Sequence, residues 1–117
     1  ALHRATGQVL WETRMADFRG HYGATSAPLV VGDLVISGVS GGDEGVRGFV
    51  AAFDVRTGRE VWRFWTVPGR GEPGSETWQG SAIDHPCAAT WLTGSYDASL
   101  GQVLWTTGNP CPDYNGD

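Results

Sequence analysis

The stretch Thr6-Gly7-Gln8-Val9-Leu10-Trp11 recurs as Thr57-Gly58-Arg59-Glu60-Val61-Trp62 and, in altered form, as Leu100-Gly101-Gln102-Val103-Leu104-Trp105. Each copy has the pattern of a glycine turn that leads into a short strand ending on a tryptophan. Successive tryptophans are 51 and 43 residues apart, a spacing too long for helical solenoid repeats and typical of a four-stranded sheet per unit. The sequence therefore predicts an all-β chain built from the blades of a β-propeller.

The composition supports an all-β chain and argues against nucleic acid as a partner. Eighteen glycines and six tryptophans, with only 18% charged residues, are typical of turn-rich sheets with large aromatic packing units. The net charge of −5 leaves no basic surface to neutralise phosphates. No apolar run approaches the length of a membrane-spanning helix.

Hydrophobic alternation and turn residues predict short strands and little helix. A two-residue turn is expected at Gly32-Asp33, between two apolar runs. Residues 68–74 contain two prolines and three glycines and are expected to form a loop, because proline removes ladder donors. The strands are expected at residues 9–13, 29–31, 34–38, 48–54, 60–67, 89–95 and 102–107.

The chain length accommodates about two to two and a half four-stranded blades. Repeat architectures need about three or more stacked units for stability, and few propellers have under about four blades. We therefore expect residues 1–117 to be part of a single propeller domain that is incomplete at both ends, as an internal segment of a longer protein.

A glycine-rich segment with two acidic residues follows the strand expected at 34–38. It reads Ser40-Gly41-Gly42-Asp43-Glu44-Gly45. Glycines let a backbone approach a flat or anionic ligand closely, while a carboxylate binds a metal or a donor group. As a bare pattern, the segment fits a turn with solvated acids better than a binding site.

Two further positions have both a functional and a structural interpretation. Asn109 ends a strand in Thr107-Gly108-Asn109-Pro110, and its side-chain oxygen is a ligand for hard cations, although Asn-Pro is also an ordinary turn initiator. Trp91 lies in an apolar strand, where core packing is the simpler interpretation. Neither residue by itself indicates a site.

Taken in order, these segments resemble the pyrroloquinoline quinone (PQQ)-dependent alcohol dehydrogenases, the quinoprotein family that includes the methanol dehydrogenase large subunit. The resemblance covers essentially the whole chain. It implies an eight-bladed propeller with PQQ and a divalent ion, usually Ca²⁺, on its central axis. The segments that carry it, besides the Thr-Gly-x-x-x-Trp repeats, are residues 24–29, 40–54, 61–68, 72–78, 91–97 and 107–110.

The resemblance gives each candidate residue a role. Trp91 would form the floor under the quinone ring. Asp43 and Asn109 would bind the metal and are expected to meet at the propeller axis. The family usually has a glutamate, which is longer, at the position of Asp43. Glu44 is therefore the possible substitute for Asp43 as a ligand. Oxygen ligands without a thiolate point to a hard ion. The residues that would contact the carboxylates and ring edge of the cofactor are Thr25, Ser40, Gly41 and Gly42.

The tryptophans are expected to divide into two groups. Trp11, Trp62 and Trp105 belong to the repeats and should be packed between blades as structural residues. Trp91, as the floor for a ring, should keep one face accessible to solvent when no cofactor is bound.

The function implied by the resemblance is the oxidation of a small-molecule alcohol in the periplasm, with a cytochrome c or a quinone as electron acceptor. The catalytic Asp of the family is expected beyond residue 117, so no catalytic residue is assigned and the segment alone should be inactive. The alternative is a cofactor-free propeller that serves as a protein-interaction scaffold in outer-membrane assembly. A scaffold has the same repeats but no reason to keep the axial residues together.

The two cysteines fit neither a zinc ribbon nor a Cys-x-x-Cys redox pair. Cys87 stands four residues before Trp91, and Cys111 stands two residues after Asn109. If the resemblance places Trp91 and Asn109 at one pocket, the two cysteine loops should be neighbours. A disulfide is then expected, with Cα atoms about 4.4–6.8 Å apart.

Overall fold

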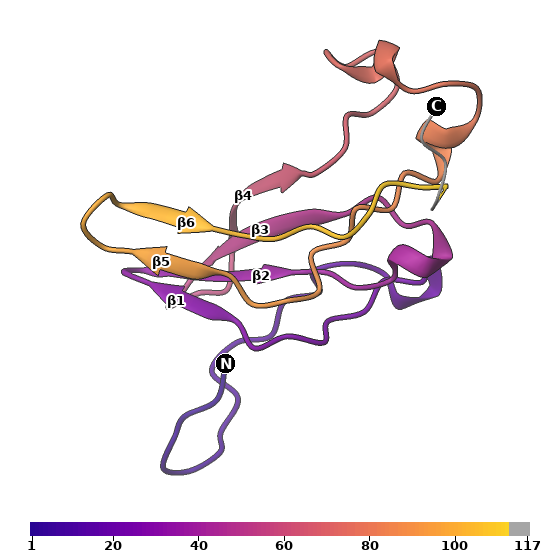
Figure 1. Cartoon of the computed structure of the whole chain (residues 1–117). Coiled ribbons are helices and arrows are strands. Elements are labelled where there is room, and N and C mark those ends of the chain that lie inside the picture. The colour runs from indigo at the N-terminus through magenta and orange to yellow at the C-terminus, as the bar shows by residue number, and fades with distance from the viewer. Residues whose placement is uncertain (113–117) are drawn as a thin grey trace.

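Four antiparallel strands form the larger sheet of residues 1–112, the part of the chain that the computed structural model describes. Neighbouring strands in the sheet are also consecutive in the chain, so the sheet is a meander (Figure 1). All four were predicted, although β3 begins one residue later and β4 ends two residues earlier than expected. The strands are β1 (Leu29–Val31), β2 (Leu34–Gly38), β3 (Phe49–Asp54) and β4 (Glu60–Trp65).

The hairpin between β1 and β2 has the predicted two-residue turn. Val31 pairs with Leu34, which leaves Gly32 and Asp33 as the loop. Gly32 has a φ of 57°, a left-handed conformation that glycine adopts without a steric penalty and that matches the twist of the flanking strands.

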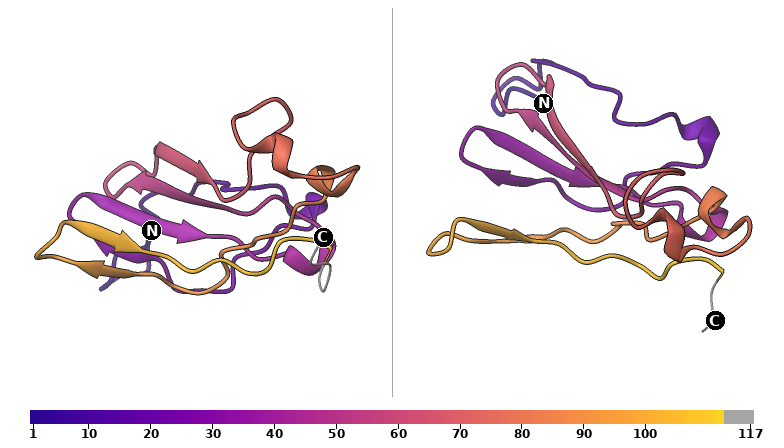
Figure 2. Two further views of the ribbon diagram at one scale, coloured as in Figure 1. Left: turned by 45° about the horizontal axis from the view of Figure 1, so that its top comes forward. Right: turned by 90° about the horizontal axis from the view of Figure 1, so that it is seen from above.

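A second, two-stranded sheet lies on one face of the larger one. It pairs β5 (Ser95–Asp97) with β6 (Gln102–Leu104), and the view from above shows it as a separate layer (Figure 2, right). Trp105, which follows β6, packs against the buried residues Ile36, Val50 and Ala52 of the larger sheet.

The core is centred on β3, whose residues from Phe49 to Phe53 are all buried. Because strand side chains alternate between faces, Phe49 and Phe53 join Val39 in one cluster, and Val50 joins Ile36 in another. Met15, Ala16 and Tyr22 of the N-terminal segment pack on the first cluster, and Trp105, after β6, packs on the second. Coverage on both faces explains why β3 is apolar at successive positions.

The three copies of the repeat all form hairpin turns whose glycine has a positive φ: 72° at Gly7, 71° at Gly58 and 64° at Gly101. In the second copy, Oδ1 of Asp54 accepts hydrogen bonds from the backbone N–H and the hydroxyl of Thr57, both at 2.8 Å. In the second and third copies the turn leads into β4 and β6, as the sequence predicted, whereas the first copy leads only into an isolated bridge.

The tryptophans of the repeats do not all dock in the same way. Trp11 lies over Gly58 of the next copy and donates from Nε1 to the Val55 carbonyl at 2.9 Å. Trp105 instead lies over Gly94, close to it in sequence. Trp62, which lies on the edge strand β4, is 39% exposed. The expected packing between blades is thus wrong for Trp62 in this chain.

Two of the predicted strands are absent as such. In residues 9–13, Val9 forms only an isolated bridge with Leu2. In residues 89–95, regular pairing begins at Ser95, and the residues before it bond to two separate segments: the Thr90 N–H donates to the Val39 carbonyl, and the Ala89 carbonyl accepts from the Gly108 N–H.

Helix is limited to four three-residue 3₁₀ turns within residues 1–112, as the lack of helical periodicity predicted. None of them has the length or apolar character of a membrane-crossing helix. They are η1 (Phe18–Gly20), η2 (Gly42–Glu44), η3 (Ser75–Thr77) and η4 (Ala82–Asp84).

Candidate functional site

Two adjoining hollows contain all the candidate residues except Glu44. Gly42, Asp43 and Trp91 line both of them. One has a volume of about 250 Å³ and is also lined by Thr25, Ser40 and Gly41. The other has a volume of about 130 Å³ and is also lined by Cys87, Ala89, Gly108, Asn109 and Cys111. Small-molecule sites usually enclose about 300–1,000 Å³. Each hollow is smaller than that, so we interpret the two together as part of a site.

A roomier hollow of about 380 Å³ lies elsewhere, between the N-terminal segment and the sheet. Its lining includes Trp11, Met15, Tyr22 and Phe53, and it contains none of the acidic candidates. It is a gap beside the core rather than a concentration of chemical groups.

The glycine-rich loop is positioned by its pairing with the segment before β1. Ser40 and Gly23 exchange backbone hydrogen bonds at 2.8 and 3.2 Å. Gly41 has a φ of 113°, and a Cβ there would overlap the carbonyl oxygen of His21. Only glycine satisfies both conditions, so the loop can turn sharply into η2.

The two acidic residues of η2 diverge. Asp43 is exposed and lines both hollows. Oε2 of Glu44 lies 3.9 Å from Nδ1 of His21, and Glu44 lines neither of these hollows. The structure therefore places Asp43 beside Trp91 and Asn109 and directs Glu44 toward His21.

Trp91 is anchored by the residue that precedes it. Thr90 is fully buried; its hydroxyl donates to the Phe49 carbonyl at 2.5 Å and accepts from the Val39 N–H at 2.8 Å. The hydroxyl of Thr25 donates to the Trp91 carbonyl at 3.3 Å. The Trp91 side chain itself remains 46% exposed, as expected for a residue that presents one face to a ligand.

Asn109 is held beside this segment by an irregular antiparallel pairing. The N–H of Gly108 donates to the Ala89 carbonyl at 2.7 Å, and the N–H of Ala88 donates to the Asn109 carbonyl at 2.9 Å. The predicted disulfide is present between Cys87 and Cys111, with a Cα–Cα distance of 5.4 Å. Two segments separated by about twenty residues thus form one wall.

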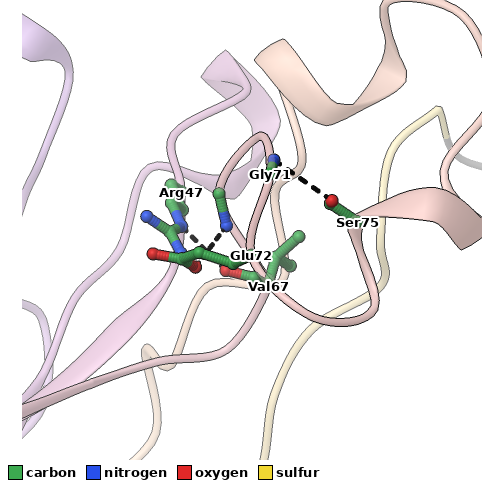
Figure 3. A network of polar contacts seen from close by, with 6 residues as sticks. Arg47, Val67, Gly71, Glu72 and Ser75 are labelled. Atoms are coloured by element: carbon green, nitrogen blue, oxygen red, sulfur yellow. Dashed lines mark hydrogen bonds and ion pairs between the residues drawn. The ribbon is translucent and has the colours of Figure 1, made fainter.

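A contact network that the sequence did not predict fixes the far end of the glycine-rich loop. Arg47 donates from Nε to the Val67 carbonyl at 2.7 Å and from Nη2 to Glu72 at 2.8 Å (Figure 3). Glu72 also accepts from the Gly69 N–H at 2.5 Å. This N–H, and secondly Arg47, lower the pKa of the Glu72 carboxyl. No spacing in the sequence signals the pair.

The described residues supply only some of the ligands that a metal ion needs. Among residues 1–112, no group of three or more His, Cys, Asp or Glu side chains is placed to hold a metal ion. Asp43 and Asn109 offer oxygen donors at the smaller hollow, whereas Ca²⁺ takes about six to eight oxygens. A metal bound here would need further ligands from outside this wall.

Two features are typical of a β-propeller segment. Tryptophans of the hairpin units dock on glycines, and separate loops converge at a hollow. Along residues 1–117 the chain matches the family model described as "Glucose/ethanol/alcohol dehydrogenase, beta-propeller domain", and it belongs to this family of PQQ-type propellers.

Similar proteins agree with this assignment. Quinoprotein alcohol dehydrogenase PedH of Pseudomonas putida is 35% identical over 96% of the chain and 22% of its own length. The lanthanide-dependent methanol dehydrogenase of Methylacidiphilum fumariolicum is 38% identical over 94% of the chain and 21% of its own length. The structure of a europium-containing methanol dehydrogenase matches with a TM-score of 0.86 at 36% identity, over 93% of this chain and 22% of that one. The chain spans about a fifth of the length of these relatives.

Proposed function

We propose that this chain is part of a PQQ-dependent dehydrogenase that oxidises small alcohols, and that residues 1–117 form part of one eight-bladed propeller domain. The observation that carries the proposal is the position of Trp91. Its exposed indole lies with Asp43 in the wall that the two hollows share, and Asn109 lines the smaller hollow beside them. In this interpretation the chain supplies the cofactor floor and part of the metal shell, and the catalytic base lies outside it.

The residues at the hollows fit PQQ in their chemistry. A flat ring needs an apolar face to stack on, and Trp91 offers one. The hydroxyl of Ser40, with the open backbone of Gly41 and Gly42, offers donors to anionic groups at the larger hollow, which Thr25 also lines. When bound, PQQ supplies the two-electron acceptor for alcohol oxidation, with its carbonyl polarised by the cation.

We propose Asp43 and Asn109 as the metal ligands, rather than Glu44 and Asn109. Both side chains are exposed and line the smaller hollow, whereas Glu44 is directed toward His21. Carboxylate and amide oxygens suit Ca²⁺. Because the names of two relatives specify a lanthanide or europium, a lanthanide is the second ion to test.

We propose a cytochrome c or a quinone as the electron acceptor. We also propose that the protein is periplasmic. A relative from Methylorubrum extorquens is named methanol dehydrogenase [cytochrome c] subunit 1, which supports the first acceptor. The disulfide between Cys87 and Cys111 suits an oxidising compartment.

The test uses the full-length protein that contains this chain, prepared without cofactor. We expect it to bind PQQ in the presence of Ca²⁺ or a lanthanide, measured by quenching of tryptophan fluorescence, and to reduce a redox dye when an alcohol is added. Failure of the wild-type protein to bind PQQ with either ion would overturn the proposal and favour the scaffold alternative.

Matched variants distinguish a tryptophan that binds the cofactor from one that stabilises the core. Trp91→Ala should weaken PQQ binding at least tenfold with little change in melting temperature. Trp105→Ala, which removes a side chain packed on the sheet core, should lower the melting temperature with less effect on binding. Asp43→Asn should weaken metal binding, whereas Glu44→Gln should leave it nearly unchanged.

A further inference from the structure

The wall of the smaller hollow contains two consecutive residues in a left-handed conformation. Cys87 has a φ of 60° and Ala88 a φ of 52°. The Cβ of an L-residue clashes with its own backbone in this region, and glycine alone adopts it freely. Residues with side chains stay there only where the surroundings hold them.

Hydrogen bonds restrain both peptide groups of this bend. The Cys87 carbonyl accepts from the Gly48 N–H at 2.9 Å, and the Ala88 N–H donates to the Asn109 carbonyl at 2.9 Å. The Ala88 carbonyl accepts from the Thr66 hydroxyl at 2.7 Å. These bonds act on the backbone, and the disulfide acts in addition on the side chain of Cys87, which is 2% exposed.

The left-handed bend forms part of the wall of the proposed site. Ala88 bonds to the backbone of Asn109, and Ala89 bonds to the N–H of Gly108, so the bend sets how the two segments meet. Cys87 and Cys111 themselves line the smaller hollow beside Asp43. A change of φ at Cys87 would move the wall that carries both Trp91 and Asn109.

We propose that the Cys87–Cys111 disulfide is a positioning device, which holds Cys87 and Ala88 in the left-handed bend and thereby presents Asn109 and Trp91 to the cofactor and its metal. Its role at the cofactor rests on the proposed function above. The competing view is that the disulfide is only a covalent staple that stabilises the fold. The two views differ in what a glycine at position 87 does.

The experiment compares two crosslink-free variants of the full-length protein. Cys87→Ala/Cys111→Ala loses the disulfide and keeps a side chain at the bend. Cys87→Gly/Cys111→Ala loses the disulfide equally, but its glycine adopts the left-handed conformation without strain. We expect the alanine variant to bind PQQ at least tenfold more weakly than wild type in the presence of Ca²⁺, and the glycine variant to recover most of that loss.

A second readout needs no cofactor. The N–H groups of Ala88 and Gly108 join the two segments, so their hydrogen exchange reports the wall directly. We expect protection in the wild type and in the glycine variant, and faster exchange in the alanine variant. If the wild type binds no PQQ, the proposed function fails, while the exchange rates still test whether the disulfide holds the bend.

Three results would overturn the inference. Equal loss of binding and protection in both variants would make the disulfide a staple only. No loss in either variant would remove any positioning role. If neither variant folds, the crosslink is required by the fold and not by the bend. If only the alanine variant fails to fold, while the glycine variant folds and binds PQQ, the inference is supported.

Discussion

The indole of Trp91 lies directly on Gly108, so that a Cβ added to Gly108 would overlap Cζ3 of the ring and lie 2.9 Å from Cη2. Gly108 precedes Asn109, the proposed metal ligand. The proposed floor of the cofactor site and the segment that carries its metal ligand are therefore in contact through a residue that has to lack a side chain.

Gly108→Ala is expected to tilt Trp91 and to weaken PQQ binding, because the added methyl group has no space beneath the ring. Overpacking of this kind costs about 1–3 kcal/mol. If the whole cost weakens the bound state, affinity falls roughly 5- to 150-fold. Fluorescence titration of the full-length protein measures it. Gly20→Ala is the control, since its Cβ would meet only Tyr22 at 3.6 Å. Equal affinities for the two variants would contradict the contact.

Trp11→Ala is expected to lower the free energy of unfolding by about 2 kcal/mol, less than the ~3–5 kcal/mol of a fully buried aromatic residue, because Trp11 is only half-buried. Trp11→Phe keeps a ring over Gly58 and loses the hydrogen bond to Val55, which should cost about 1 kcal/mol. Denaturant titration of the full-length protein measures both. If neither variant is destabilised, Trp11 does not dock the two units.

The hairpin turns should lose stability in acid. The Thr57 hydroxyl, and then its backbone N–H, lower the pKa of Asp54 below its usual value. Since the pKa is lower in the folded state, the stabilisation is present above the unfolded value of about 4 and is lost as the pH falls through the folded one. The melting temperature should therefore drop below about pH 4, and the part due to this turn should shrink in Asp54→Asn. An unchanged pH profile for this variant would show that the turn contributes nothing.

Arg47→Lys is expected to loosen residues 67–75 although the positive charge is kept. A lysine has no planar fork and loses the paired contacts to Val67 and Glu72. The guanidinium also stacks 4.5 Å from the centre of the Trp65 ring. Hydrogen exchange at the Gly69 N–H, which donates to Glu72, should become faster. Glu72→Gln keeps an acceptor oxygen and should speed this exchange less than Arg47→Lys does. If Glu72→Gln speeds the exchange more, charge alone orders the loop.

The repeated turns and most strands were predictable because their causes are local. A glycine with positive φ and an acidic residue that caps the turn lie within five positions of each other, as in Asp54 to Gly58. Short apolar runs bounded by turn residues in 29–54 likewise identify β1, β2 and β3. The prediction failed at residues 89–95 because Thr90 bonds to Val39 and Ala89 bonds to Gly108, and no local pattern signals such distant partners.

The site could be predicted only in part. The resemblance selected Trp91, Asp43 and Asn109, and all three line the smaller hollow. Which of two adjacent acids enters the hollow was left open by the sequence, because one residue of a tight 3₁₀ turn can face the site while the next faces away. The Arg47–Glu72 pair was missed because 25 positions separate its members and no pattern links them.

The sequence alone determined the kind of unit, an all-β hairpin repeat with a glycine turn and a docking tryptophan, since turn chemistry and strand alternation act between near neighbours. The tertiary structure alone decided where each tryptophan docks: Trp11 on the next repeat, and Trp105 on its own hairpin region. It also decided that Asp43 shares a wall with Asn109. The physical reason is that such contacts depend on how separate sheets and loops pack together, and one local pattern is compatible with several packings.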